Sequence, residues 1–505
     1  MVKAEPILAV PVTDKTESDH AEGTHAGRPY QRELAACGAA LVLGVCVELL
    51  IAWFTHHKGV NLTGDEPAYI IQAQSYLHLK VTILTTIKAD LTRHRLAAYP
   101  VGVTPGMVAQ FLGPRGVISP FEPGLGILLI PFVATGHLFL GATTGMAAIS
   151  VAGLVYLHRR TSRLMHLSRR GQLLLALALV APAILVAVTQ IYPDFLSGVF
   201  LACALVEVAL LERTQHSSRF GSLVILVTLA WLPWLQIKNL VPAGITLVVI
   251  AIVRHRARAS QWHTVALVGV VCVSWAVLLI YNARYFGHLG GLPEPSPNLG
   301  KDGIEYTLGL LIDRDQGLFI QVPVAILGLV GLWTARRRVP FSVVASVGSV
   351  LAILILNGTY SGNPYGGRSL AGRFMWSLIP IFAIWIGSCI ERWQEAGRSL
   401  KIPAGVIAIL WIVQAIPIVD GSHLYYNPFQ TPPLPAAAWS GWWHGVDRFL
   451  PMFGLPGHYF GEPASAILVV LCAGALVIAA VGLYGSTKTL RFDRRKRPEK
   501  RAEQS

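Results

Sequence analysis

The sequence predicts an all-α polytopic membrane protein, and three observations support this fold class. Of its 505 residues, 53% are hydrophobic and only 13% are charged, whereas an ordinary soluble domain carries about 25% charged residues. The mean hydropathy of the chain is +0.54. The apolar residues form long runs, and a run of about 20 residues spans a bilayer as a helix. A soluble enzyme, a disordered protein, a coiled coil, a disulfide scaffold and an outer-membrane barrel of alternating strands are therefore excluded.

Thirteen apolar runs are candidates for helices at membrane depth. They delimit a membrane domain at 35–484, between an N-terminal tail at 1–34, expected to be flexible and cytoplasmic, and a basic cytoplasmic tail at 485–505. Because the first 34 residues are polar, no cleavable signal peptide is expected. The runs cover residues 35–54, 124–140, 142–157, 171–191, 194–211, 221–236, 239–253, 264–282, 318–334, 341–356, 374–390, 403–419 and 464–484.

Basic clusters determine the predicted orientation of these helices. Lysine and arginine concentrate in cytoplasmic loops, so we expect the clusters to lie in the cytoplasm. Much of the net charge of +14 lies in these loops and the C-terminal tail, which argues against nucleic-acid binding. The clusters fall at 159–170, 254–258, 336–338, 392–401 and 494–497.

The run at 124–140 is predicted to enter the membrane without crossing it. With the N-terminus inside, the run 35–54 ends outside, and the run 142–157 also starts outside because it ends at the Arg159 cluster. The intervening run must therefore return to its own side as a re-entrant or interfacial helix. Prolines and glycines interrupt it, and broken backbone at membrane depth is tolerated where it lines a protein cavity. The prediction is about twelve crossings, with longer outer segments at 55–123, 283–317, 357–373 and 420–463.

The first outer segment contains the acidic sequence NLTGDEP at 61–67, followed by a predicted helix at about 66–79. Asp65 and Glu66 are candidate functional acids. A purely structural interpretation is also open, because Thr63 and Glu66 have the spacing of a capping box and acids favour a helix N-terminus. Tyr69 and Ala73 share a helix face with residues 76–77, which predicts an amphipathic helix on the membrane surface.

A second acid, Asp194, follows the outward-going run 171–191 on the same side of the membrane. The next run begins at once, so this side chain is expected between two helices. An ionisable group at membrane depth is costly and marks a functional site by default. The alternative is an N-cap for the following helix. Two carboxylates on one face can supply a general base and a binding or metal-ligating group.

Three arginines on the outer side are candidate phosphate ligands. Arg314 stands between two aspartates, while Arg368 and Arg373 lie in the sequence GGRSLAGR at 366–373. Glycines allow close approach of the backbone to a ligand, and arginine matches phosphate oxygens. Pairing with nearby acids or lipid headgroups is the alternative role for each arginine.

A Gly-Asp-Glu-Pro motif at 64–67 just past the first run, a helix after it, and a further outer Asp at 194 resemble the GT-C glycosyltransferases. These integral-membrane enzymes use polyprenyl-phosphate sugars, and they include protein O-mannosyltransferases and the aminoarabinose transferase that modifies lipid A. The similar order extends over roughly 40–390. The resemblance implies a GT-C-like catalytic domain at 35–484 and a hexosyl- or pentosyltransferase activity.

The resemblance also implies roles for individual residues. Asp65 matches the catalytic acid that accepts a proton from, or positions, the acceptor hydroxyl. Glu66 matches its companion acid, and Asp194 matches the second acidic position. Tyr69, in the same short run, is expected among the substrate-binding residues. Some members use a divalent metal and others do not, so the metal stays open, and no other cofactor is expected.

The expected partners are a polyprenyl-phosphate-linked sugar, a glycan, lipid or protein acceptor, and membrane lipids. The expected location is the inner (plasma) membrane of a cell envelope, with the site facing outside or the periplasm. Two alternatives stay open at this point: a transporter or flippase, and an enzyme similar to O-antigen ligases that acts on lipid-linked glycans. The early Asp65-Glu66 pair favours the glycosyltransferase over the ligase-like enzyme. A transporter is disfavoured because the sequence shows neither repeat symmetry nor charged residues deep within the runs.

Overall fold

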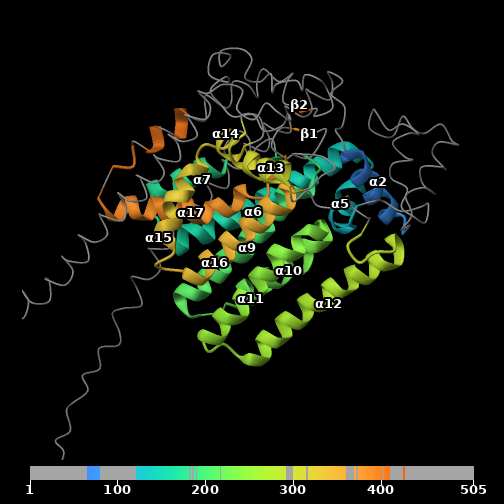
Figure 1. Ribbon diagram of the computed structural model, residues 1–505, viewed down its shortest axis with the longest axis horizontal. Helices are drawn as coiled ribbons and strands as arrows, with labels where there is room; N and C mark the ends of the chain where they lie inside the picture. The colour runs from blue at the N-terminus through green and yellow to red at the C-terminus, as the bar shows by residue number, and fades with distance from the viewer. Residues whose placement is uncertain are drawn as a thin grey trace, which may run out of the picture.

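The computed structural model describes a helical bundle with one short pair of strands (Figure 1). The strands β1 (Ser369–Leu370) and β2 (Tyr425–Tyr426) are antiparallel, with Ser369 opposite Tyr426. Apart from these two strands of two residues each, every regular element of the described residues is a helix, so the predicted all-α class is confirmed. The described residues are 65–79, 121–180, 184, 187–188, 190–216, 218–291, 300–313, 317–359, 369–370, 373–397, 399–401, 403–405, 407–409 and 425–426.

Most of the helices coincide with predicted apolar runs, whereas the helix at 301–312 lies in a predicted outer segment and the run 318–334 is divided between two helices. In the first half they are α2 (Glu66–Leu77), α5 (Gly124–Val133), α6 (Leu138–Leu164), α7 (Arg169–Leu179), α9 (Pro193–Thr214), α10 (Arg219–Leu235), the 3₁₀ turn η2 (Ile237–Asn239), α11 (Leu240–Arg256) and α12 (Gln261–Phe286). In the second half they are α13 (Lys301–Ile312), α14 (Leu318–Gln321), α15 (Ala325–Ala335), α16 (Pro340–Gly358), the 3₁₀ turn η4 (Arg373–Met375) and α17 (Ile379–Glu395).

Five described segments are long and apolar enough to cross a membrane, which makes the chain a multi-pass membrane protein. They are α6, α9, the η2–α11 segment, α12 and α16. The runs 35–54 and 464–484, both terminal tails and most of 403–419 lie outside the described residues. The count of about twelve crossings therefore stays a prediction.

Helix α5 has the dimensions of a partial insertion. Its 10 residues give a length of about 15 Å, half of the hydrocarbon thickness of about 30 Å. Pro131 lies inside the helix, and Gly136 has a φ of +87° in the turn that follows. The predicted run 124–140 is thus divided, because its last residues already belong to α6.

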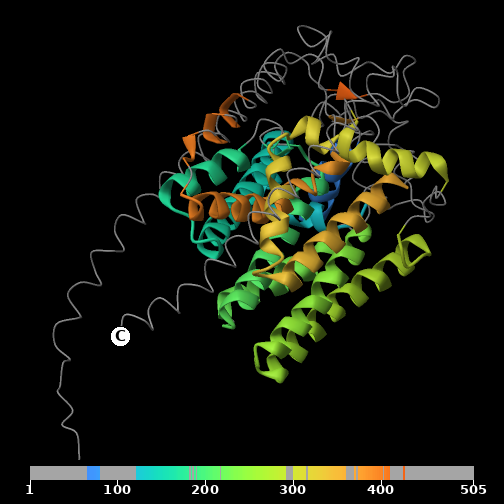
Figure 2. The same cartoon turned by 60° about the vertical axis from the view of Figure 1, so that its left-hand side comes forward.

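Helix α9 forms the centre of the bundle and packs against α6, α10, α11, α16 and α17. Every residue from Pro193 to Leu211 is buried except Phe200. By contrast, α12 lies at the edge of the bundle beside α10, as Figure 1 and Figure 2 show. Its long apolar side chains, such as Val273 and Ile280, are exposed, as expected for a helix that faces lipid.

Helices α15 and α17 pack closely because small residues line the contact. A Cβ atom on Gly331 would overlap the backbone carbonyl of Trp385, and one on Gly328 would meet the ring of Phe382. This contact fixes α17, the helix that follows η4, against the rest of the bundle.

We expect Gly331→Val to lower the free energy of unfolding by about 1–3 kcal/mol, because the added methyl groups force the two helices apart. The measurement is the midpoint of thermal unfolding of the purified protein in detergent. Gly269→Val is the matched control, since a Cβ there has nothing within 4 Å. Equal midpoints for the two variants would contradict the assigned contact.

Helix α2 is confirmed as a helix, but the prediction that it lies on the membrane surface is wrong. Its first turns are buried on all sides, with Tyr69 2% exposed and Ala73 0% exposed. It packs against α5, and the side chain of Gln72 donates a hydrogen bond of 3.0 Å to the carbonyl of Phe121. The polar side chains of Glu66, Gln72 and Ser75 are therefore buried in the protein instead of facing water.

Candidate functional site at the start of helix α9

Asp194 lies in the first turn of α9, and its side chain is fully buried. Tyr192 is the N-cap residue with extended backbone, and Pro193 occupies the first turn, where its missing N–H costs nothing. The alternative interpretation of Asp194 as an N-cap is therefore wrong. A carboxylate buried this deeply requires ionic partners, and the structure provides two.

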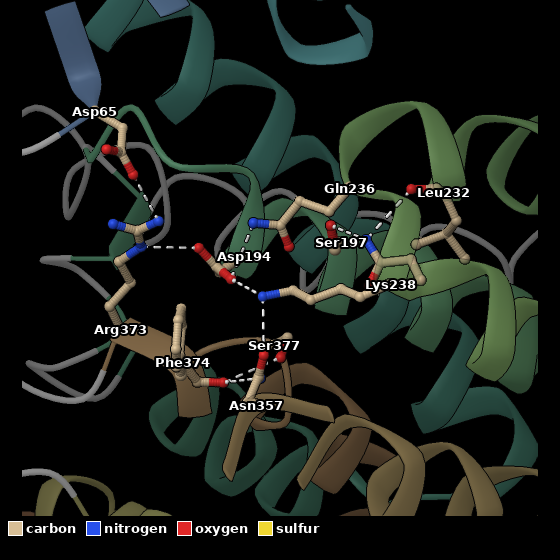
Figure 3. A network of polar contacts seen from close by, with 11 residues as sticks. Asp65, Asp194, Ser197, Leu232, Gln236, Lys238, Asn357, Arg373, Phe374 and Ser377 are labelled. Atoms are coloured by element: carbon tan, nitrogen blue, oxygen red, sulfur yellow. Dashed lines mark hydrogen bonds and ion pairs between the residues drawn. The ribbon is translucent and has the colours of Figure 1, made fainter. Parts of the chain in front are cut away.

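The first partner is Arg373, which connects the two acids predicted from the sequence (Figure 3). Its Nε donates to Asp194 Oδ2 at 3.1 Å, and its Nη2 donates to Asp65 Oδ2 at 3.0 Å. Asp65 directly precedes α2, and Arg373 begins η4. Residues 308 positions apart in the sequence thus meet at one point.

The second partner is Lys238, in the short η2 turn between α10 and α11. Its Nζ donates to Asp194 Oδ1 at 3.1 Å and to Asn357 Oδ1 at 2.8 Å. Gln236 also donates to Asp194 Oδ1, at 3.2 Å. Asn357 in turn donates to the carbonyl of Phe374 at 2.9 Å, which ties the end of α16 to η4.

The η2 turn is held in place by Asn239. Its side-chain amide donates to Ser197 Oγ at 2.9 Å and to the carbonyl of Leu232 at 3.3 Å. Asn239 is buried, and its hydrogen bonds connect α9, α10 and the start of α11. The position of Lys238 beside Asp194 is therefore determined by neighbouring backbone, and not by its own flexible side chain alone.

The cluster of Asp65, Asp194, Arg373 and Lys238 has two negative and two positive charges. Accessibility divides it into two layers: the side chains of Asp65 and Lys238 are 32% and 28% exposed, whereas those of Arg373 and Asp194 are 8% and 0% exposed. Asp65 Oδ1 has no hydrogen-bond partner among the described residues. Asp65 and Lys238 are therefore the more accessible members of the cluster, and they lie over the buried pair of Arg373 and Asp194.

The guanidinium of Arg373 is also stacked, with its Cζ 3.9 Å from the centre of the Tyr192 ring. Burial disfavours its charged form, but Asp65 and Asp194 outweigh burial and raise the pKa of Arg373 above its ordinary value. The side chain is therefore a permanent cation with a fixed orientation. Such preorganised charge costs no reorganisation when a new negative charge develops nearby.

Glu66 and Tyr69 lie behind the charge cluster. Glu66 is 4% exposed, and its Oε1 accepts a hydrogen bond of 3.0 Å from the backbone N–H of Ile191. Tyr69 is 2% exposed, and its ring lies 4.8 Å from that of Phe121, measured between ring centres. Burial, together with the charge of Asp65, raises the pKa of Tyr69 well above its ordinary value. Glu66 thus ties the start of α2 to the residue before the N-cap of α9, whereas Tyr69, a neutral phenol, packs against Phe121 shortly before α5.

Of the three predicted arginines, only Arg373 belongs to the described residues, and it is in the cluster. Arg314 and Arg368 lie outside them. Sequence reasoning missed Lys238 and Asn357. The signal for Lys238 was present: it is a cation in the two-residue gap between the runs 221–236 and 239–253, on the same predicted side as Asp194.

The donor atoms of the cluster do not form a metal site. Within the described ranges no group of three or more His, Cys, Asp or Glu residues lies close enough to hold a metal ion. The two carboxylates of the cluster are each bound to Arg373, and a cation between them would meet that positive charge. The present geometry suits an anionic ligand better than a metal ion.

The site and the fold define a helical multi-pass membrane protein with a charged cluster at one end of its bundle. No protein-family model matches the sequence, and no curated protein matches it. Two solved structures are similar: ArnT from Cupriavidus metallidurans in the apo state, with 16% identity and a TM-score of 0.46, and the same protein bound to undecaprenyl phosphate, with 17% identity and a TM-score of 0.45. Each comparison covers 88% of this chain and 74% of the ArnT chain.

Proposed function

We propose that the protein is a glycosyltransferase that moves a sugar from a polyprenyl-phosphate donor to an acceptor hydroxyl at the extracytoplasmic membrane face. The donor class follows from the resemblance of the motif at 64–67 to the GT-C enzymes. The observation that carries the proposal is the bridge from Asp65 through Arg373 to Asp194. It combines an accessible carboxylate with fixed positive charge, which are the two groups that this transfer requires.

In the proposed reaction, Asp65 accepts the proton of the acceptor hydroxyl while that oxygen attacks the anomeric carbon of the sugar. A new glycosidic C–O bond forms, and the C–O bond to the phosphate breaks. The bonding electrons leave with the polyprenyl phosphate, whose added negative charge is stabilised by Arg373 and Lys238. Asp194 does not touch the substrate in this scheme, and it positions both cations.

The direct test supplies the purified full-length protein with a polyprenyl-phosphate sugar labelled in the sugar, together with lipid, glycan or protein acceptors from an envelope fraction. We expect label in one acceptor class and release of one polyprenyl phosphate for each sugar transferred. Movement of intact donor across vesicles without transfer would instead identify a flippase, and joining of preassembled glycans alone would identify a ligase.

We expect Lys238→Gln to reduce kcat/KM for the donor by about 10²-fold, because one of the two cations near the leaving phosphate is lost. Arg373 remains, so activity is reduced and not abolished. Initial rates at several donor concentrations measure the effect. Lys401→Gln, which removes an exposed lysine outside the cluster, is the control, and an equal loss in both variants would contradict a role for Lys238.

The extracytoplasmic orientation is supported by the separation of two groups of charge along the helices. Asp194 and Lys238 lie at the starts of α9 and α11, whereas Arg213 and Arg256 lie at their ends. Because basic clusters favour the cytoplasm, the carboxylate cluster belongs on the other side.

Single cysteines at His137 and Arg159, which are exposed at the two ends of α6, test this orientation in a chain whose six native cysteines are replaced. We expect a membrane-impermeant thiol reagent to label His137→Cys in intact cells and Arg159→Cys only after the membrane is opened. Labelling of both from the same side would contradict it.

A further inference from the structure

A cavity of about 720 Å³ lies at the opposite end of the bundle from the charge cluster. The end of α6 forms most of its wall, and the turn before α7 and the start of α10 complete it. Glu207, beside the cavity, is thirteen residues after Asp194 on the same helix, a separation of about 20 Å. The cavity is therefore distinct from the candidate catalytic site. Its lining includes Tyr156, Arg159, Arg160, Ser162, Arg163 and Phe220.

The positive charge of this cavity is only partly neutralised. Arg160 forms an ion pair with Glu207, and Tyr156 donates a hydrogen bond of 2.6 Å to the same carboxylate. Arg159 and Arg163 are one helical turn apart, and neither has an ionic or hydrogen-bonding partner in the described part of the chain. Two exposed arginines that line one cavity and have no counter-ion among the described residues can together bind an anion such as phosphate.

A buried hydroxyl supports the same interpretation. Ser162 lines the cavity and is 4% exposed, and its Oγ has no hydrogen-bond partner among the described residues. A buried hydroxyl without a partner costs free energy, and a ligand or water that forms a hydrogen bond with it would recover that cost. An anion held by Arg159 and Arg163 would accept this hydrogen bond.

An apolar stripe on α10 indicates that the anion belongs to a lipid. Phe220 lines the cavity, and Phe220, Leu223 and Val227 are 61%, 52% and 52% exposed. Their spacing of three and four residues puts them on one face of α10, and the stripe runs from the cavity toward the membrane interior. A soluble anion would leave this apolar surface uncovered, whereas an acyl chain would cover it.

We propose that this cavity binds one anionic phospholipid, with Arg159 and Arg163 on its phosphate and an acyl chain along the α10 stripe. Basic pockets between membrane helices recognise anionic headgroups in this way. Such a lipid would join α6, α7 and α10 at the face opposite the site. The proposal does not depend on the glycosyltransferase activity.

The test measures lipid binding to the purified full-length protein in detergent by native mass spectrometry. The probes are dioleoylphosphatidylglycerol, which is anionic, and dioleoylphosphatidylcholine, which is zwitterionic. We expect one tightly held phosphatidylglycerol, preferred at least about tenfold over phosphatidylcholine. Equal binding of the two lipids, or displacement of phosphatidylglycerol by millimolar inorganic phosphate alone, would overturn the assignment to a lipid.

Variants locate the site. We expect R159A/R163A to weaken phosphatidylglycerol binding about thirtyfold, R159K/R163K to restore part of it, and Ser162→Ala to weaken it a few-fold. R256A/R258A removes the same charge from another exposed cluster and is expected to leave the binding unchanged. An equal loss in R256A/R258A, or no loss in R159A/R163A, would overturn the proposal. The conservative Ser162→Ala variant keeps the test informative if the double variants do not fold.

Discussion

Asp65→Asn is expected to lower the rate of sugar transfer by about 10²–10⁴-fold, the range for loss of a positioned general base. The amide has the shape of the carboxylate and can still accept a hydrogen bond from Arg373, so the fold is retained. It cannot take the proton of the acceptor hydroxyl. The measurement is transfer of labelled sugar by equal amounts of folded protein, judged by size-exclusion chromatography in detergent.

Two comparisons make the Asp65→Asn result specific. Glu395→Gln removes a half-exposed acid at the far end of α17 and is expected to leave transfer unchanged. Asp194→Asn leaves Arg373 and Lys238 without their buried counter-ion, so we expect a lower unfolding midpoint as well as lost transfer. A folded Asp65→Asn protein with the normal transfer rate would rule out the proposed base.

The second large effect is expected at Arg373. Arg373→Ala removes the group that neutralises both Asp65 and Asp194, and breaking such a buried pair costs about 3–5 kcal/mol of stability. Transfer is expected to fall about 10³-fold in the protein that remains folded, because the leaving phosphate loses one of its two cations and Asp65 loses the group that orients it. The two readouts are the unfolding midpoint and the initial rate.

Arg373→Lys separates the charge of this residue from its shape. Lysine retains the positive charge, but a single ammonium group lacks the planar fork that contacts two carboxylates and stacks on Tyr192. We therefore expect a folded protein with a raised KM for the donor and a lowered kcat. Arg392→Lys, at the other end of α17, is the control, and unchanged kinetics in Arg373→Lys would contradict the phosphate role.

The sequence predicted the long helices well, because an apolar run long enough to span a membrane is compatible with few structures other than a helix. It predicted the environment of α2 poorly. Tyr69 and Ala73 share one helix face, which indicated a helix with one buried apolar side. Gln72 and Ser75, which lie outside that apolar face, are buried too. Hydrogen bonds to distant backbone, such as that from Gln72 to Phe121, depend on tertiary contacts that no local periodicity contains. The helix α13, in the predicted outer segment 283–317, was also missed, because its 12 residues form no apolar run of membrane length.

The sequence predicted both acids of the candidate site but only one of its two cations. Asp65 and Asp194 stand out because acids beside apolar runs are rare, and Arg373 was one of three arginines with similar local surroundings. Lys238 gave a weaker signal, because a single lysine between two helices looks like an ordinary turn residue. Asn357, at the end of α16, has no chemical signal of its own. Only the tertiary structure brings Lys238 and Asn357 to the carboxylate.

The way Asp194 is neutralised has a consequence for biosynthesis. A chain inserted from its N-terminus contains Asp194 long before Arg373, which lies 179 residues further on. Lys238 follows after only 44 residues, in the hairpin that returns to the same membrane edge. The lysine is therefore the first counter-ion available to the newly inserted aspartate, and the arginine later joins a carboxylate that is already paired. A nascent chain that stops after α11 thus already contains Asp65, Asp194 and Lys238, and Arg373 is the one member of the charge cluster that it lacks.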